Sequence, residues 1–240
     1  MVPLYFVLMK KSYSKYLFEF IIIVFGISVS FQFDKYSEEV EKEKLKNQSL
    51  NRILKNIQQD IADHTLNINI HQDGVTSIEW VLDNYENTGI DRAEIGRELT
   101  SAILMNTILV DNQEEYRSLQ NSGLIEKIEN DSLVNNLQQK YSAHTFYKKI
   151  EQALTDLINN NLTAFHYNNS ISEDSLKRTS AFLNNGRIYT GKLPIDRTII
   201  EVLKDKKFYH EFYIRQIKNR IKRDGILIQQ IQAETNNINQ

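Results

Sequence analysis

The chain has 240 residues, of which 41% are hydrophobic and 25% charged, and its formal net charge at pH 7 is −2. This near-neutral charge argues against a nucleic-acid-binding protein, which would carry a basic excess. The absence of cysteine excludes disulfides, thiol catalysis and cysteine-based zinc sites. Two prolines and eight glycines are too few for the turns of a β protein of this length, so the composition favours long helices.

The first predicted element is an apolar transmembrane helix over residues 17–33, LFEFIIIVFGISVSFQF, which follows a short tail over 1–16. A helix over this range rises about 25 Å, which approaches the ~30 Å hydrocarbon core of a bilayer. Glu19, Gly26 and Ser30 share one face of this helix, and the two small residues would let a second helix approach closely. The alternative is a lone span that tolerates small residues.

Charges on the two sides of this segment bear on its orientation. Lys10, Lys11 and Lys15 precede it without an acidic residue among them, whereas the lysines that follow are interleaved with Asp and Glu. By Lys and Arg count the two sides nearly tie, and the short basic N-terminus favours the cytoplasm for itself. We therefore expect a bacterial inner-membrane protein with a periplasmic body. A signal peptide is the alternative, although no small-residue cleavage site follows, and Met9 is a second candidate start of translation.

Residues 34–49 are highly charged and are predicted to continue the helix as a stalk, with a flexible linker as the alternative. From Leu50, apolar residues and two histidines alternate by four and three positions, as in a coiled coil or a helical bundle. This seam consists of Leu50, Leu54, Ile57, Ile61, His64, Ile68, His71, Val75, Ile78, Leu82 and Tyr85. Gly89 is the predicted C-cap of the long helix.

Shorter helices are predicted next, over 92–106 behind an Asp91 cap and over 113–122 behind Asp111 or Asn112. A turn leads to Asn130 and Asp131, where a helix over about 132–167 begins. The remaining predicted elements are a weak helix over 172–183, a loop over 186–194 with a short extended piece, a brief helix over 196–203 and a last helix over about 205–238.

The lengths of these helices predict the architecture. The helices over 50–85, 132–167 and 205–238 would each be about 50 Å long, and the pair within 91–121 supplies a broken fourth rod of similar reach. We therefore predict an all-α protein whose transmembrane helix continues into an up-down-up-down bundle over 50–240. The last helix would return beside the first, which places Tyr85 near Phe208 and Leu50 near Ile238.

No pattern in the sequence specifies a catalytic site, so we expect a non-enzymatic protein without a cofactor or a metal. His64 and His71 lie seven positions apart, whereas helical metal pairs use three or four, so a role in fixing helix register is the simpler interpretation. The segment GRIYTGK has the spacing of a P-loop, but Leu193 stands where magnesium binding needs Ser or Thr.

One aromatic group in the last helix is a candidate ligand pocket. It consists of Phe208, Tyr209, Phe212 and Tyr213, which span both faces of one helix turn. Ordinary core packing where the bundle closes is the alternative interpretation.

Two stretches resemble an uncharacterised family of Bacteroidetes membrane proteins, a domain of unknown function. In the first, FEFIIIVFGISVSFQFDKYSEE, the family's Glu, Gly and Gln match Glu19, Gly26 and Gln32, and Tyr36 replaces its Trp. The second, YRSLQNSGLIEKIENDSLVNNLQQKY, matches the family signature at Tyr116, Leu119, Ser122, Gly123, Ile128, Asn130 and Leu133. The resemblance implies a membrane anchor and a helical body, and it implies no activity.

The second signature also has a physical interpretation. Ser122 and Gly123 would allow a tight turn, and Asn130 would cap the next helix, so we expect a device that connects helices. Taken together, the sequence predicts a membrane-anchored bundle that acts by binding another membrane or periplasmic protein or a second copy of itself, with no nucleic acid. The alternative is a ligand-sensing bundle that signals through a partner subunit.

Overall fold

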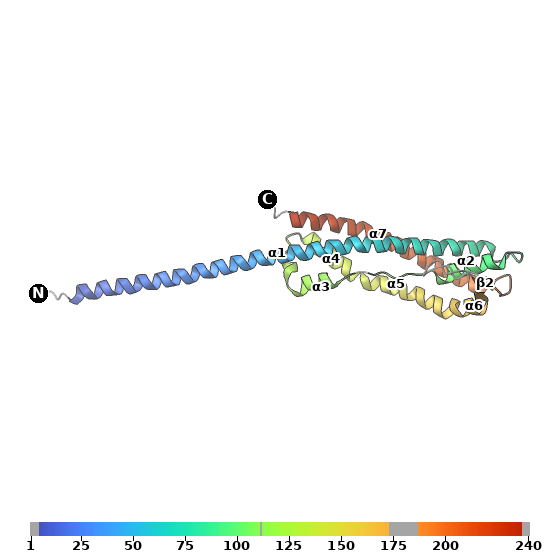
Figure 1. Cartoon of the computed structure of the whole chain (residues 1–240), viewed down its shortest axis with the longest axis horizontal. Helices are drawn as coiled ribbons and strands as arrows, with labels where there is room; N and C mark the ends of the chain where they lie inside the picture. Colours follow the sequence, from blue (N-terminus) through green and yellow to red (C-terminus); the bar gives the residue numbers. More distant parts are fainter. Residues whose placement is uncertain (1–4, 111, 173–186, 237–240) are drawn as a thin grey trace.

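The computed structural model describes residues 5–110, 112–172 and 187–236, and it is all-α apart from one short hairpin (Figure 1). Its elements begin with α1 (Tyr5–Asn84), α2 (Arg92–Leu104), α3 (Glu114–Asn121) and the 3₁₀-helix η1 (Leu124–Lys127). They continue with α4 (Asp131–Ser142), α5 (His144–Leu157), the π-helix η2 (Ile158–Leu162), α6 (Thr163–Asn168), β1 (Ser170–Ser172), β2 (Arg187–Tyr189) and α7 (Arg197–Asn236).

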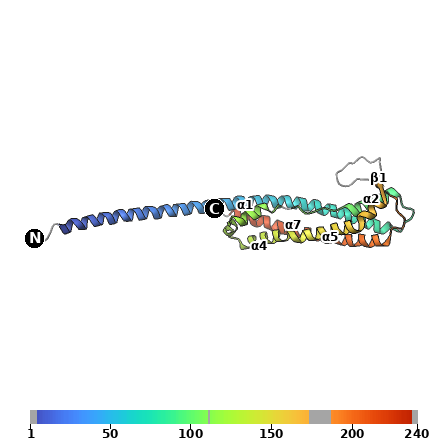
Figure 2. The same cartoon turned by 90° about the horizontal axis from the view of Figure 1, so that it is seen from below.

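Helix α1 is one continuous rod with two different surroundings. Its N-terminal half projects from the molecule, while its C-terminal half runs along the bundle (Figures 1 and 2). Every side chain from residue 15 to residue 41 is exposed, and we call this stretch the arm. Lys46 is the first buried residue, so the last part of the predicted stalk packs in the bundle.

Helix α7 lies antiparallel to the bundle part of α1, as predicted, but the predicted register was wrong. The backbone N–H of Ile195 donates to the carbonyl of Tyr85 at 3.1 Å, so Tyr85 lies beside the start of α7 and not beside Phe208. Leu50 packs in a cluster with Leu227 and Ile231, and Ile238 lies outside the described residues. The error arose because the brief helix and the last helix are one helix, which begins at Arg197 behind the Asp196 side chain.

The other two rods are interrupted. Helix α2 ends at Leu104, and an extended segment leads to α3, so the fourth rod is broken by extended chain and not by a simple turn. The predicted single helix over 132–167 is divided at Ala143 and by the π-turn η2. The helix predicted over 172–183 lies, beyond Ser172, outside the described residues.

A two-stranded hairpin caps the far end of the bundle. Strand β1 pairs antiparallel with β2, with Ser170 opposite Tyr189 and Ser172 opposite Arg187. The predicted extended piece is β2, whereas β1 was not predicted. Gly96 on α2 allows this packing, because a Cβ there would lie 1.9 Å from the carbonyl oxygen of Arg187.

The predicted helix-connecting device is present in the geometry. Gly123 ends α3 with φ of 72°, a left-handed conformation that favours glycine, and the Asn130 side chain accepts the backbone N–H of Leu133 at 3.1 Å. The Ser122 hydroxyl donates to the carbonyl of Ser118 at 2.8 Å. The apolar members of the signature are buried in one cluster, which includes Tyr116, Leu119, Ile128 and Leu133.

The buried face of α1 differs by one residue from the predicted seam. Leu50, Ile57, His64, His71, Val75 and Ile78 are buried, as predicted. At the alternate positions the buried residues are Ile53, Asp60, Asn67, Gly74 and Val81, each one residue before the predicted member; of those members, Leu54, Ile61, Ile68 and Leu82 are only partly buried. The prediction was shifted at these positions because Asp60, Asn67 and Gly74 are not large apolar residues, whereas the residue after each of them is apolar.

Candidate functional site: polar layers in the bundle core

Polar side chains occupy heptad positions where helix bundles ordinarily bury apolar ones. From α1 they are Lys46, Asp60, His64, Asn67 and His71, and from α7 they are Lys206, His210, Arg220, Asp224 and Glu234. Burying such groups is unfavourable unless each finds a charge or hydrogen-bond partner. In the layers described next, the partners come from other rods, so these layers tie the rods together.

Three charged residues form what we call the ionic layer. The Lys140 ammonium of α4 lies 2.9 Å from Asp60 of α1 and 3.1 and 3.0 Å from the two carboxylate oxygens of Asp224 of α7. All three side chains are almost completely buried, and His64 Nε2 lies 3.9 Å from Asp224. Helix α7 is unbroken through Asp224 and Gly225, and Lys140 neutralises the buried Asp224 carboxylate.

A second layer joins the extended segment to the bundle. The Glu151 carboxylate accepts hydrogen bonds from the Tyr213 hydroxyl at 2.9 Å and from the Leu109 backbone N–H at 2.5 Å. Lys148 donates to the same carboxylate at 2.9 Å and to the Leu109 carbonyl at 2.7 Å. Burial, and secondly the Glu151 charge, raise the pKa of Tyr213, which therefore stays a neutral donor.

A third group, the histidine layer, consists of His71, His210 and Lys206. The two Nδ1 atoms lie 2.5 Å apart, a contact that requires one ring nitrogen to donate and the other to accept. Lys206 donates to the carbonyls of Ala102, Ile103 and Met105 at 2.7, 2.8 and 3.1 Å, where α2 ends.

Burial controls the protonation of the histidine layer. Desolvation lowers the pKa of His71 to about 4, of His210 to about 2 and of Lys206 to about 7. The Lys206 charge contributes in the same direction to the pKa of each histidine. Both imidazoles are therefore neutral at pH 7, which suits a hydrogen bond between two rings.

The layers do not assemble a metal site. Within the described residues there is no group of three or more His, Cys, Asp or Glu side chains placed to hold a metal ion. His64 and His71 do not meet, because the first lies beside Asp224 and the second contacts His210.

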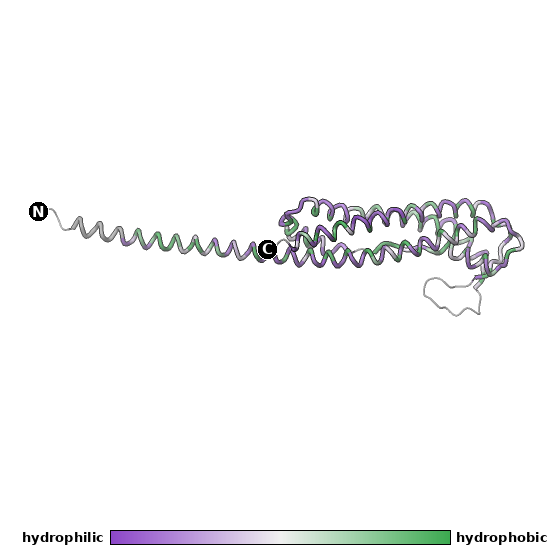
Figure 3. Tube along the Cα trace, turned by 90° about the horizontal axis from the view of Figure 1, so that it is seen from above, coloured by the Kyte–Doolittle hydropathy of each residue, from purple (hydrophilic) through white to green (hydrophobic). Residues whose placement is uncertain are grey.

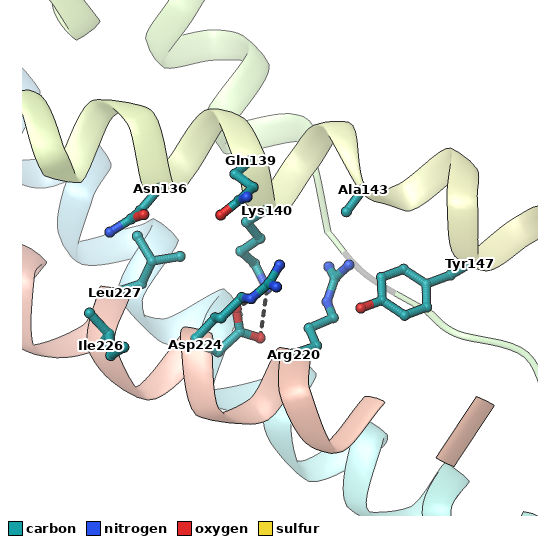
Figure 4. Close-up of a pocket in the computed structure, with 10 residues that line it drawn as sticks. Asn136, Gln139, Lys140, Ala143, Tyr147, Arg220, Asp224, Ile226 and Leu227 are labelled. Carbon is teal, nitrogen blue, oxygen red and sulfur yellow. Dashed lines mark hydrogen bonds and ion pairs between the residues drawn. The ribbon is translucent and has the colours of Figure 1, made fainter. Parts of the chain in front are cut away.

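A cavity of about 60 Å³ opens beside the ionic layer, between α4, α5 and α7 (Figure 4). The guanidinium of Arg220 lies 5.0 Å from the centre of the Tyr147 ring in its wall, and Arg220 is only 4% exposed. The lining residues are Asn136, Gln139, Lys140, Ala143, Tyr147, Arg220, Arg223, Asp224, Ile226 and Leu227. Neither this cavity nor the layers were predicted from the sequence.

The four residues of the predicted aromatic pocket do not converge on one space. Tyr213 is fully buried and bonded to Glu151, whereas Phe208 is 58% exposed. Phe208 stacks on Phe212 with ring centres 6.4 Å apart, and Phe212 meets Phe146 of α5 edge-on at 6.3 Å. Tyr209 is partly buried beside the cluster that contains Tyr213.

The predicted helix-packing residues Glu19, Gly26 and Ser30 lie on the exposed arm. An added Cβ at Gly26 would meet no atom within 4 Å, and Gly26 and Ser30 line a shallow groove along α1. Lys15 lies 3.9 Å from Glu19 on the same helix. Whatever covers this face is therefore not another described part of the chain.

The arm contains the one described stretch that is long and apolar enough to cross a membrane (Figure 3). Core helices of soluble proteins and signal sequences meet the same criterion of length and composition. None of this stretch is buried in the molecule, which distinguishes it from a core helix.

Comparison of the chain with protein-family models, with curated proteins and with solved structures finds no match.

Proposed function

We propose that this protein is a membrane-anchored, non-enzymatic helical bundle that acts by protein–protein interaction, as a scaffold, an accessory subunit or a self-assembling component. The observation that carries the proposal is the arm. Large apolar side chains such as Phe18, Ile22 and Phe25 are more than half exposed there, which would be unfavourable in water along so long a helix. A lipid bilayer would cover them.

Fractionation of cells that produce the full chain tests the anchor. We expect the protein in the membrane pellet, resistant to alkaline carbonate and released by detergent. Ile22→Asp combined with Phe25→Asp should move it to the soluble fraction, because an aspartate at the centre of a span costs ~2.5–3.5 kcal/mol. Leu66→Asp is the matched control, since Leu66 is 56% exposed on the same helix within the bundle. Full-length protein in the supernatant without detergent would refute the anchor.

The orientation is part of the proposal and has its own test. The chain contains no cysteine, so single cysteines can report accessibility without background. With a cytoplasmic N-terminus and a periplasmic bundle, a membrane-impermeant maleimide should label Ser118→Cys in intact spheroplasts and should label Ser12→Cys only after lysis. The reverse pattern would place the bundle in the cytoplasm.

Binding of partners is tested by purification of the full chain in mild detergent. A defined homo-oligomer, or a membrane or periplasmic protein that co-purifies at constant stoichiometry, supports the proposal. A second candidate function, ligand sensing, is favoured by the cavity beside the ionic layer. A ligand bound there would lie next to the layer that contains Asp60 of α1, the same helix that continues into the arm. A monomeric bundle that retains a small molecule would support the second function over the first.

A further inference from the structure

The cavity between α4, α5 and α7 lies where the rod formed by α4 and α5 is interrupted. Helix α4 ends at Ser142, α5 begins at His144, and Ala143 between them lines the cavity. Helix α7, which supplies Arg220, Asp224 and Leu227 to the lining, is continuous there.

The wall chemistry favours an anion. Arg220 and Arg223 both line the cavity, and Figure 4 shows the Arg220 side chain between Asp224 and Tyr147. Asp224 is the sole acidic residue among those that line it, and Lys140 already binds both of its carboxylate oxygens. Arg223 is exposed and makes no hydrogen bond or ion pair with any described residue. A guanidinium in this position can bind a carboxylate with two parallel hydrogen bonds.

The size and the remaining lining restrict the ligand further. A cavity of about 60 Å³ holds roughly four to six water-sized atoms, since each needs ~10–15 Å³ of such volume. Ala143, Ile226 and Leu227 supply apolar contacts in the lining, and Asn136 and Gln139 add two amides. A short aliphatic acid has this size, one planar anionic head and a small apolar tail.

We propose that this cavity binds a small aliphatic carboxylate, with its head on Arg223 and Arg220 and its tail against Leu227. The site adds to the proposed sensing role, and it does not depend on the membrane anchor. An occupant would contact Lys140 of α4 and Asp224 of α7, which line the cavity. Lys140 also pairs with Asp60 of α1, so the ionic layer beside the occupant joins three of the four rods.

Binding can be measured on the full chain in detergent at pH 7. Sodium butyrate, with six non-hydrogen atoms, is the probe, and isothermal titration at constant ionic strength gives its Kd. Inorganic phosphate and chloride are the comparison anions. We expect butyrate to bind in the millimolar range or tighter and to raise the unfolding temperature, and we expect phosphate to bind at least several-fold more weakly.

Variants separate the site from a general effect of salt. Arg223→Gln should weaken butyrate binding roughly tenfold, the loss typical of one charge-assisted hydrogen bond, and Ala143→Leu should abolish binding by filling the space. Arg215→Gln, an exposed position on α7 outside the cavity, is the matched control and should bind as the unchanged chain does. Circular dichroism establishes that each variant is folded.

Three results would overturn the proposal: no saturable butyrate binding, tighter binding of phosphate than of butyrate, or equal weakening by Arg223→Gln and Arg215→Gln. The membrane fractionation above is independent of these outcomes, so failure of this site and failure of the anchor are distinguishable.

Discussion

The two halves of α1 belong to one unbroken helix, but their side chains have opposite surroundings. Along residues 17–33 of the arm, apolar side chains face outward on every side, whereas along the bundle half charged and polar side chains such as Asp60 and His71 face inward. The arm has no described partner, and each inward polar group named here lies against a side chain of another rod. The comparison shows that burial in this protein follows the available partners more closely than it follows hydrophobicity.

The largest test of this comparison removes a partner from the bundle half. Lys140→Met removes the ammonium that binds the buried carboxylates of Asp60 and Asp224, and we expect a loss of about 3–5 kcal/mol in the free energy of unfolding. Urea unfolding of the full chain in detergent, followed by circular dichroism, measures it. Lys149→Met, at an exposed position of α5, is the control and should change little. If the triple replacement Asp60→Leu, Lys140→Met and Asp224→Leu failed to recover most of the loss, charge burial would not be its cause.

The second test uses pH on the histidine layer. Because burial holds the pKa values of His71 and His210 below the unfolded value near 6.5, the unfolded chain binds protons between about pH 6.5 and pH 4 that the folded chain does not. Stability should therefore fall as the pH falls through this range, by up to ~1.4 kcal/mol per pH unit for each histidine.

The groups that face the two rings are Lys206 and, 4.5 Å from His71, the ring of Tyr213. Urea midpoints at pH 7 and pH 5 measure the slope, and the double variant His71→Gln, His210→Gln should flatten it. An identical slope in the double variant would show that acidic groups elsewhere cause the whole effect.

The third test addresses the arm. If the face with Glu19, Gly26 and Ser30 packs against a second copy, Gly26→Leu should weaken self-association in detergent by roughly tenfold, because close backbone approach needs a small residue. Val24→Leu changes the opposite side of the helix and is the control. Sedimentation equilibrium in density-matched detergent gives the dissociation constants, and equal constants for both variants would exclude this face.

The smallest effect is expected at the connection between α3 and α4. Asn130→Ala removes the side-chain acceptor for the Leu133 N–H and should cost about 1 kcal/mol of unfolding free energy. Asn135→Ala, at an exposed position inside α4, should be neutral or slightly stabilising, since alanine is the better helix former. The same urea titration measures both, and an equal response would mean that the cap is not formed.

The elements that depend on local chemistry were predictable. The helical class, the turn at Gly123 and the Asn130 cap follow from residues close in sequence, and the antiparallel return of the last helix follows from the similar lengths of the helices. The register error came from ending a helix between Leu203 and Asp205, where nothing in the structure interrupts α7.

The ionic layer was not predictable in the same way. Its members Asp60, Lys140 and Asp224 come from three rods, and only the folded arrangement brings the two carboxylates within 3.1 Å of the Lys140 ammonium. The sequence did contain a signal for the buried positions, since Asp60 and Asn67 share the heptad spacing of Ile53 and Val81. The residue after each of these positions is apolar, however, and it gave the stronger heptad pattern. The extended chain after Leu104 was missed for a related reason, because its backbone is bonded by side chains distant in sequence.

The continuity of α1 also fixes a distance. From Phe33 to Asn84 an unbroken helix extends about 75 Å, so the hairpin end of the bundle stands that far from the end of the apolar stretch over 17–33. A rigid helix of this length keeps a partner bound at the hairpin end at a fixed distance from the surroundings of the arm. Insertion of whole turns into the exposed stretch over 34–41 would lengthen that span by ~5.4 Å per turn without rotating the bundle far from its original orientation.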